Sequence, residues 1–504
     1  MLTFADPLHH ALEVAPRKVG VIDGERQLTF AEFADRCARL AHALRGLGLR
    51  KGDRVAILSQ NRHEYLEAYV GVPASGLVIV PLNTRHALPE LEYAVRDSGA
   101  RVLLTDRDVA TCPSLGQRVI AFGREYEALL ASADPAPLGR DVRENDLAGL
   151  FYTGGTTAAS KGVMLSHRNL ISNSYHWMTT VPQRADDVFV IIAPLFHAAG
   201  SNGVLASLWT LGTQVTLGAF DPKRALDALA QHRGTQTLVV PTMLAALAEE
   251  QLQRPRETQT LRAIAHGGSP VAIEVLRRGC QAFPGAELVE VYGATELSPL
   301  ATALTGENAL LDHERGRSCG RAVVGVRVRI VGASGRTQPY GEVGEVVVRG
   351  ANVMLGYWNK PGETAAALRD GEYWTGDLGR MDDEGYLYLV DRCKDMIVTG
   401  GENVYCTEVE DALYRHPAVL EAAVFAVPDD KWGEAVHAVV VPRPGHDGID
   451  AASLVAFCRE RIAHYKVPKT IDLRNEPLPK SGPGKVLKRE LRAPFWKGRD
   501  RNVG

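Results

Sequence analysis

The sequence lacks the signatures of several protein classes. Its seven cysteines are widely spaced and include no Cys-x-x-Cys pair, which argues against a disulfide scaffold or a zinc site and favours a reducing compartment. No uninterrupted apolar run approaches the roughly 18 residues that a membrane span needs. The first residues show no basic segment followed by an apolar one, so we expect no signal peptide and a soluble, cytoplasmic protein.

An excess of either charge is also missing. The 57 basic and 60 acidic residues give a net charge of -3, so no large field would attract nucleic acid or an anionic membrane. The hydrophobic fraction of 45% is typical of a folded chain, and 504 residues correspond to about three folding units. We therefore expect any phosphate-bearing ligand to be held by a few local cations.

Helical and strand-like segments alternate over the first part of the chain. Thr29 and Glu32 form a capping-box pattern before apolar residues spaced by three and four, which predicts a helix over 30–47. The order strand, helix, strand indicates a parallel sheet. The predicted strands are 54–58, 77–81, 101–105, 188–192, 237–240 and 288–291, and the predicted helices between them are 64–72, 88–97 and 223–232.

The pattern changes near residue 320, where short alternating strands at 326–330, 345–349 and 386–389 predict a small β-barrel or sheet. A further unit follows a boundary near 391–394, with strands at 422–427 and 435–441 and a helix at 451–464. The predicted fold class is α/β. We expect a large N-terminal domain of two parallel-sheet α/β subdomains plus a small β-barrel, followed by a small α+β domain.

Residues 152–162, Tyr-Thr-Gly-Gly-Thr-Thr-Ala-Ala-Ser-Lys-Gly, follow an apolar strand and have the composition of a phosphate-binding loop. Glycines let the backbone approach an anion, hydroxyl groups donate to its oxygens, and Lys161 adds positive charge. The spacing is not that of a P-loop NTPase, and no Gly-x-Gly is completed by the third glycine of a dinucleotide-binding fold. On residue types alone, a Ser/Thr/Gly turn stays open.

Three more segments carry polar groups at the ends of strands or in glycine turns. Tyr292 to Glu296 combine an aromatic ring, a glycine, a hydroxyl and a carboxylate, which suits a base, phosphates and Mg²⁺. Asp377 follows a glycine turn and could accept hydrogen bonds from ribose hydroxyls. Lys485 lies on a late glycine loop. Each segment alone is also compatible with a turn or a solvated surface charge.

In combination and order, these motifs resemble the AMP-forming acyl-CoA synthetases, whose superfamily includes peptide-synthetase adenylation domains and beetle luciferases. The resemblance runs from about Leu28 to Leu491. It implies an N-terminal adenylate-forming domain over 1–391 with a β-rich part over 320–390, a hinge at 392–394 and a mobile lid domain over 395–504. The implied ligands are ATP, Mg²⁺, CoA and a carboxylic acid, with no nucleic acid and no integral membrane association; a homodimer stays open.

The resemblance also implies a role for each motif residue. Lys485 would bridge the acid carboxylate and the α-phosphate, Glu296 would bind Mg²⁺, and Tyr292 would stack on adenine. The remaining ATP-binding positions are Thr153, Thr156, Thr157 and Lys161 for the β- and γ-phosphates, Thr295 for the α-phosphate, Asp377 and Arg392 for the ribose, and Gly267, Gly268, Ser269 and Gly293 around the adenine.

Thioester formation would follow a rotation of the lid about Lys394, which would present Gly400 and Gly401 to the pantetheine arm. His197 resembles the family's aromatic gate, although without the family a satisfied core histidine is the better interpretation. Gly154, Ala158 and Ser160 depart from the usual loop, which puts its geometry and ATP affinity in question. Cys406 stands where proline is common, and we interpret it as a buried residue rather than a nucleophile.

The acid is predicted from the expected pocket wall. Residues 197–202, 240–243, 266–268 and 291–298 contain no lysine or arginine, and Val240, Met243, His266 and Leu297 would contact the acyl group. A second carboxylate would be unpaired there, so a monocarboxylic acid is favoured, with a medium- to long-chain fatty acid as the main hypothesis. The alternatives are an aryl-acid CoA ligase, an acyl-AMP ligase that acylates a carrier protein, and a non-catalytic nucleotide-binding regulator.

Overall fold

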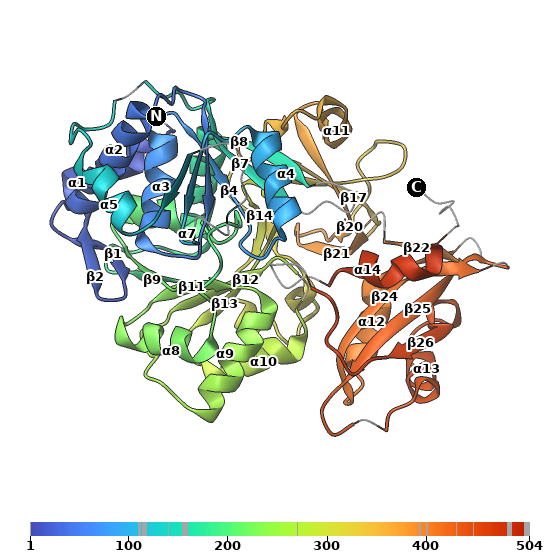
Figure 1. Cartoon of the computed structure of the whole chain (residues 1–504). Helices are drawn as coiled ribbons and strands as arrows, with labels where there is room; N and C mark the ends of the chain where they lie inside the picture. Colours follow the sequence, from blue (N-terminus) through green and yellow to red (C-terminus); the bar gives the residue numbers. More distant parts are fainter. Residues whose placement is uncertain are drawn as a thin grey trace. The chain divides into compact units, whose positions relative to one another are not determined.

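The computed structural model describes residues 2–108, 112, 118–139, 141–153, 160–269, 271–392, 395–399, 402–429, 431–446, 448–480 and 486–497, without the side chain of Arg392. The chain forms two compact units. The first comprises residues 1–328 and 348–374, and the second comprises 329–347 and 375–504 (Figure 1).

A nine-stranded sheet in the first unit has the order β15-β14-β13-β12-β11-β9-β10-β1-β2. Its inner strands are parallel, and antiparallel strands extend both edges. The strands are β1 (Val19–Asp23), β2 (Arg26–Thr29), β9 (Val188–Ile191), β10 (Thr213–Thr216), β11 (Gln236–Val239), β12 (Ala263–Gly267), β13 (Glu287–Gly293), β14 (Leu300–Leu304) and β15 (Arg321–Ala322).

Three helices pack on one face of β9 to β13: α8 (Pro222–Gln231), α9 (Pro241–Gln253) and α10 (Ile273–Ala282) (Figure 1). Leu226, Leu244 and Leu276, one from each helix, are buried against Ile264 and Leu288 of the sheet. This core holds β11, β12 and β13 side by side, so the ends of these strands are fixed relative to one another.

A seven-stranded sheet, also in the first unit, has the order β18-β8-β7-β4-β3-β5-β6. The strands are β3 (Arg54–Leu58), β4 (Val78–Pro81), β5 (Val102–Thr105), β6 (Arg118–Ala121), β7 (Leu147–Thr153), β8 (Lys161–Ser166) and β18 (Gly356–Tyr357). The helices around the two sheets are α1 (Ala5–Val14), α2 (Phe30–Gly46), α3 (His63–Ala74), α4 (Leu88–Ser98), α5 (Arg124–Ala131), α6 (His167–Thr180) and α7 (Asn202–Thr210), with α11 (Pro361–Ala367) after β18. Thr29 and Glu32 form the expected capping box at the start of α2.

A five-stranded sheet has the order β16-β17-β20-β19, with β21 paired to β20. Its strands are β16 (Arg327–Val331), β17 (Gly344–Arg349), β19 (Leu368–Arg369), β20 (Glu372–Met381) and β21 (Leu387–Arg392). This small sheet lies where the alternating pattern predicted a β-rich part.

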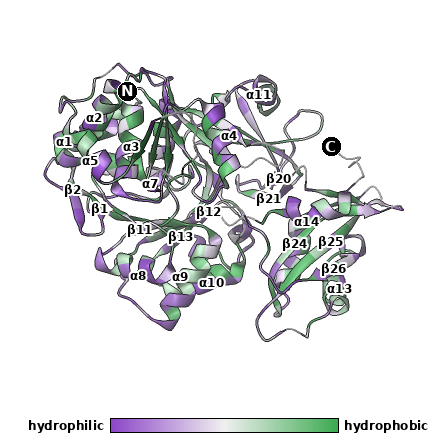
Figure 2. Ribbon diagram, viewed as in Figure 1, coloured by the Kyte–Doolittle hydropathy of each residue, from purple (hydrophilic) through white to green (hydrophobic). Residues whose placement is uncertain are grey.

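The C-terminal part of the second unit is an α+β domain. Its sheet, β23-β22-β25-β24 with β26 on β25, comprises β22 (Ile397–Thr399), β23 (Glu402–Val404), β24 (Val419–Asp429), β25 (Gly433–Pro442) and β26 (Thr470–Leu473). The helices are α12 (Cys406–Tyr414), α13 (Ala451–Arg459) and α14 (Lys488–Arg492). Hydrophobic residues run along β24 and β25 (Figure 2), and most of β25 is buried. Cys406 is buried as expected.

The predicted fold class is confirmed, with one refinement. Both large sheets are mixed rather than wholly parallel, because β7 and β8 form an antiparallel hairpin and β13 pairs with β14 in the same way. Within the described residues, no helix is long and apolar enough to cross a membrane. The domain limits at 391 and 395 and the hinge at 392–394 stay predictions, since Cys393 and Lys394 lie outside the described residues.

Candidate active site

Four of the predicted segments lie at the carboxyl edge of the nine-stranded sheet. His197 follows β9, Val240 follows β11, Gly267 ends β12, and Tyr292 and Gly293 lie at the end of β13. Because β9, β11, β12 and β13 are parallel, their carboxyl ends share one edge. Ligands of open α/β sheets bind at this edge, so the topology supports a common site for these segments.

The glycines at the end of β12 allow an unusually close approach of β13. Gly267 pairs with Val291, and a Cβ atom added to Gly267 would lie 2.1 Å from the Val291 carbonyl oxygen. Gly268 has φ of +84° and open space around its Cα, a backbone conformation that other residues rarely adopt. Glycine is therefore required at both positions for the backbone of the turn that is expected to line the adenine. Ser269, the next residue, is partly exposed.

His197 is enclosed and neutral at physiological pH. Burial lowers its pKa to about 4, and the Arg85 and His86 charges act in the same direction. Its ring lies 4.6 Å from the Phe196 ring, and its buried Nε2 atom has no hydrogen-bond partner among the described residues. An uncharged imidazole with one unpaired nitrogen fits either an aromatic gate or a site for a ligand hydrogen bond.

The residues predicted to contact the acyl group are mostly buried. Met243 is almost fully buried at the start of α9 and Leu297 is fully buried, while Val240 packs against the core of α8 to α10. His266 is also fully buried, and its Nε2 atom lies 2.7 Å from Glu307 Oε2. This imidazole is already bound to a carboxylate of the protein through one nitrogen, which the sequence pattern did not indicate.

The His266 ion pair belongs to a buried acid cluster. Burial disfavours the imidazolium form, but the Glu307 hydrogen bond and charge outweigh burial and raise the pKa of His266. Burial raises the pKa of Glu290 on the neighbouring strand to about 7, with the positive charge of His266 opposing the shift. The Cys319 thiol lies 3.7 Å from the Glu290 carboxylate. His266 and Glu290 are register partners on β12 and β13, one residue before Gly267 and Val291.

The predicted phosphate loop connects the two strands of a hairpin. Thr153 at the end of β7 pairs with Lys161 at the start of β8, and the Thr153 hydroxyl oxygen lies 3.5 Å from the Lys161 carbonyl oxygen. Thr156 and Thr157, together with Gly154 and Ala158, lie outside the described residues. The described ends of the loop therefore place Thr153 and Lys161 side by side at its base.

Tyr357 lies between the two charges predicted to handle ATP. The Lys161 Nζ atom is 4.8 Å from the centroid of the Tyr357 ring, and the Tyr357 hydroxyl donates a hydrogen bond of 2.8 Å to Glu296 Oε1. Burial and the Glu296 carboxylate raise the pKa of Tyr357 above its usual value, so the hydroxyl remains a donor. Lys161 also forms an ion pair of 2.7 Å with Glu363.

The two residues predicted to bind the ribose belong to the second unit. Asp377 on β20 and Arg392 on β21 are register partners in an antiparallel pair, and Asp377 is buried. The backbone N–H of Asp377 donates to the Thr375 hydroxyl at 3.0 Å. The structure thus places these two predicted residues next to each other on one small sheet, although nothing further is described for the Arg392 side chain.

Several predicted residues lie outside the described residues: Lys485, Thr156, Thr157, Gly400, Gly401 and the hinge residue Lys394. Their roles stay predictions. Thr295 is described, and it begins the short 3-10 helix Thr295–Leu297, which carries Glu296 and immediately follows the β13 segment.

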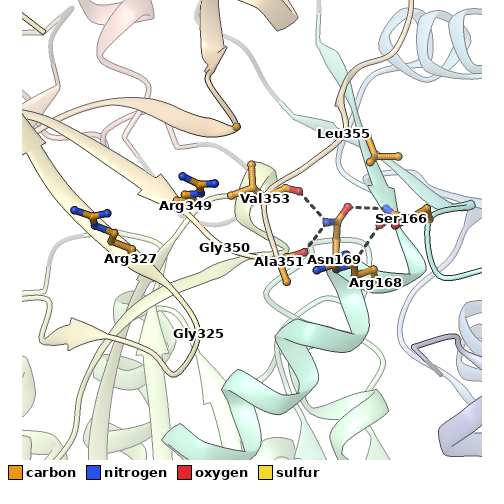
Figure 3. A pocket seen from close by; sticks show the side chains of 12 residues that line it. Ser166, Arg168, Asn169, Gly325, Arg327, Arg349, Gly350, Ala351, Val353 and Leu355 are labelled. Atoms are coloured by element: carbon orange, nitrogen blue, oxygen red, sulfur yellow. Dashed lines mark hydrogen bonds between the residues drawn. The ribbon is translucent and has the colours of Figure 1, made fainter.

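A separate pocket of about 550 Å³ opens at the start of α6 in the first unit. Its described lining includes Arg168, Arg327 and Arg349 and no carboxylate, and Figure 3 shows Asn169 bonded to the carbonyl groups of Ala351 and Val353 in its wall. Within the part of the chain that the structure describes, no predicted site residue lines it. It is a polar surface pocket distinct from the strand-end site.

The sequence pattern missed Tyr357 and Glu363. They follow Glu296 by about 60 residues, within the β-rich part, so no local spacing connects them with Lys161 or Glu296. The available signal was the sequence Gly356-Tyr-Trp358, in which a glycine precedes two aromatic residues. Trp358 donates from its indole nitrogen to the Asp97 carbonyl at 2.9 Å, which anchors this segment to α4.

Comparison with protein families gives two matches along this chain. Residues 8–358 match the family described as AMP-binding enzyme, and residues 408–485 match the AMP-binding enzyme C-terminal domain. Together the two matched ranges account for most of the chain.

Two curated relatives and one solved structure illustrate the likeness. A feruloyl-CoA synthase of Amycolatopsis sp is 41% identical over 484 residues, which cover 96% of this chain and 97% of the relative. A long-chain-fatty-acid–CoA ligase of Bacillus subtilis (strain 168) is 34% identical, covering 94% and 91%. The crystal structure of ATP-bound MatB from Rhodopseudomonas palustris has a TM-score of 0.88 at 33% identity and covers 98% of both chains.

Proposed function

We propose, from the premise that this chain belongs to the AMP-binding enzyme family and is an AMP-forming acid–thiol ligase, that its acid substrate is an aryl acid of the hydroxycinnamate class. The observation that carries the proposal is the 41% identity to a feruloyl-CoA synthase along nearly the whole of both chains. The fatty-acid ligase of Bacillus subtilis is 34% identical. The aryl-acid alternative is therefore better supported than the medium- to long-chain fatty acid that the sequence motifs favoured.

The chemistry of the strand-end segments is consistent with this choice. Met243 and Leu297 are apolar and buried, and the segments contain no lysine or arginine to pair a second carboxylate. The depressed pKa of His197 keeps that imidazole uncharged, so it offers one neutral polar contact rather than a cation. A flat monocarboxylic acid with neutral oxygen substituents suits such a wall, whereas an unpaired dicarboxylate would be costly to bury.

We further propose that the first step uses ATP at the hairpin of β7 and β8. The acid carboxylate oxygen attacks the α-phosphorus, the bond to pyrophosphate breaks, and an acyl-AMP forms. Lys161 at the base of the hairpin would offset charge on the β- and γ-phosphates, and Lys485 would bring the two reacting anions together. In the second step the CoA sulfur attacks the acyl carbon and AMP leaves, with Gly400 and Gly401 beside the pantetheine arm.

The donor set around Glu296 fits Mg²⁺. This ion is held in proteins by one or two carboxylates together with phosphate oxygens and water, and Glu296 supplies one carboxylate close to the predicted phosphate cation. The Tyr357 hydrogen bond fixes one Glu296 oxygen and orients the carboxylate. A bound Mg²⁺ would supply neutralisation of the phosphate charge.

A panel of acids tests the substrate class. Purified enzyme is given MgATP, labelled pyrophosphate and one acid at a time: ferulate, coumarate, cinnamate, decanoate, palmitate or malonate. We expect the highest kcat/KM for ferulate or coumarate and no exchange above background with malonate. A kcat/KM for decanoate or palmitate that exceeds every aryl acid would contradict the proposal and restore the fatty-acid hypothesis.

The same preparation distinguishes the thiol acceptor. With the preferred acid and CoA present, we expect a CoA thioester detectable by mass spectrometry. Accumulation of the acyl-AMP in the presence of CoA would instead favour transfer to a carrier-protein thiol. Nucleotide binding without pyrophosphate exchange for any acid would favour the non-catalytic regulator.

A further inference from the structure

The Lys161 ammonium contacts two other side chains of the protein. It forms an ion pair of 2.7 Å with Glu363 and lies on the face of the Tyr357 ring at 4.8 Å. Glu363 stands in the first turn of α11, and Lys360 lies 3.8 Å from its other oxygen. The Glu363 carboxylate is thus held between two lysines, and the Lys161 hydrogen bond is the largest cause of its lowered pKa.

Tyr357 keeps Lys161 and Glu296 apart. Its ring face contacts the ammonium while its hydroxyl binds the Glu296 carboxylate, so the two opposite charges do not neutralise each other. Glu363 is the carboxylate that pairs with Lys161 instead. A phosphate that approaches Lys161 therefore competes with Glu363 for the ammonium, and Glu363 would also repel that phosphate because both are anions.

We propose that Glu363 is a positioning residue that competes with nucleotide phosphates for Lys161 and thereby weakens ATP binding. The inference rests on the proposed function, in which Lys161 contacts the β- and γ-phosphates. The ion pair between Glu363 and Lys161 makes and breaks no covalent bond in the reaction. Its effect is confined to the affinity for ATP and leaves the chemistry of the bound complex unchanged.

The test compares Glu363→Gln with the wild-type enzyme. The amide keeps the shape of the side chain and removes its charge, so Lys161 is released to the phosphates. The Glu363 side chain is 42% exposed, and exposed ion pairs of this kind contribute modestly. We expect the dissociation constant of MgATP, measured by calorimetry without any acid, to fall about two- to fivefold. The KM for ATP should fall equally, while kcat and the KM for the acid stay unchanged.

Two variants serve as controls. Glu249 pairs with Arg278 at 45% side-chain exposure, away from the predicted phosphate residues, so Glu249→Gln should leave the affinity for ATP unchanged. Glu363→Asp keeps the negative charge at the start of α11 but withdraws the carboxylate, and it should tighten ATP binding by less than the glutamine variant. The advantage of Glu363→Gln should shrink at high salt, because screening weakens the pair in the wild-type enzyme.

The outcomes separate this inference from the proposed function. Wild-type enzyme that binds no MgATP would contradict the proposed function. Wild-type enzyme that binds MgATP, combined with a Glu363→Gln variant of equal or weaker affinity, would overturn the role of Glu363 alone. An equal gain in Glu249→Gln would also overturn it, because the effect would then be one of general surface charge.

Discussion

The acid cluster that includes His266 of β12 and Glu290 of β13 predicts a pH-dependent stability that one substitution should remove. Glu290 has its pKa raised to about 7 by burial, and His266, Glu307 and the Cys319 thiol face it. We predict that Glu290→Gln is more stable than the wild-type enzyme at pH 8 and indistinguishable from it near pH 5. The amide has the shape of the protonated acid, which is the form that the folded wild-type protein holds at low pH.

The sign of the pH dependence of stability follows from whether the folded or the unfolded state binds the proton more tightly. In the unfolded chain Glu290 ionises near its ordinary pKa of 4.5, whereas the folded protein keeps it protonated up to about pH 7. Between these values folding takes up a proton, so stability falls as the pH rises. A shift of this size corresponds to at most about 3.5 kcal/mol at pH 8, because one pKa unit equals about 1.4 kcal/mol.

Thermal unfolding at pH 5, 6, 7 and 8 measures the effect. The difference in Tm between Glu290→Gln and the wild type should grow from near zero to several degrees across this range. Glu274, an exposed residue of α10 paired with Arg277, supplies the control Glu274→Gln, whose Tm difference should not vary in this way. A Tm difference for Glu290→Gln that is negative at pH 8, or constant with pH, would refute the reasoning.

Three further predictions concern the reaction. Lys485→Ala should lose adenylation, measured by pyrophosphate exchange, by a factor of about 100 or more, while added acyl-AMP is still converted to thioester; equal loss of both steps would contradict its role. Lys394→Pro should retain adenylation and abolish thioester formation in the same two assays, and loss of adenylation would argue against a hinge there. Gly267→Ala should lower the free energy of unfolding by about 1–3 kcal/mol, seen as a lower Tm, because its Cβ would overlap the Val291 carbonyl. It should also raise the KM for ATP. Gly285→Ala, whose Cβ has no atom nearer than 4.0 Å, should do neither.

The alternation of strands and helices predicted the architecture because each element buries one face in a regular period. The helix predicted over 30–47 is α2 (Phe30–Gly46), and the strand predicted at 54–58 is β3. The strand pairing at the edges of the sheets was harder to predict from the sequence. Whether β8 returns antiparallel to β7 depends on the loop between them and on pairing with β18, almost 200 residues later, and a local pattern contains neither.

In the candidate site, too, local sequence patterns predicted some residues, while partners from distant segments were missed. Residues at the ends of β12 and β13 were predictable because strand ends carry their own signal, a glycine or polar residue after an apolar run. His266 was assigned to the acyl pocket from its position, but Glu307 binds it from a separate segment and makes it part of an ion pair. The chemistry of a buried histidine is set by its partner, and the partner becomes visible only in three dimensions.

Under the proposed function, the arrangement around Tyr357 offers a way for a chain of nearly zero net charge to bind a polyanion. A cation left unpaired in a partly enclosed site would be costly, and a carboxylate beside it would neutralise the charge that the phosphates require. Lys161 lies on an aromatic face and has Glu363 as a partly exposed partner, with which a phosphate could compete. Glu296 accepts a hydrogen bond from the neutral Tyr357 hydroxyl. Lys161 and Glu296 thus contact different parts of the same tyrosine, an arrangement that suits MgATP binding under the proposed function.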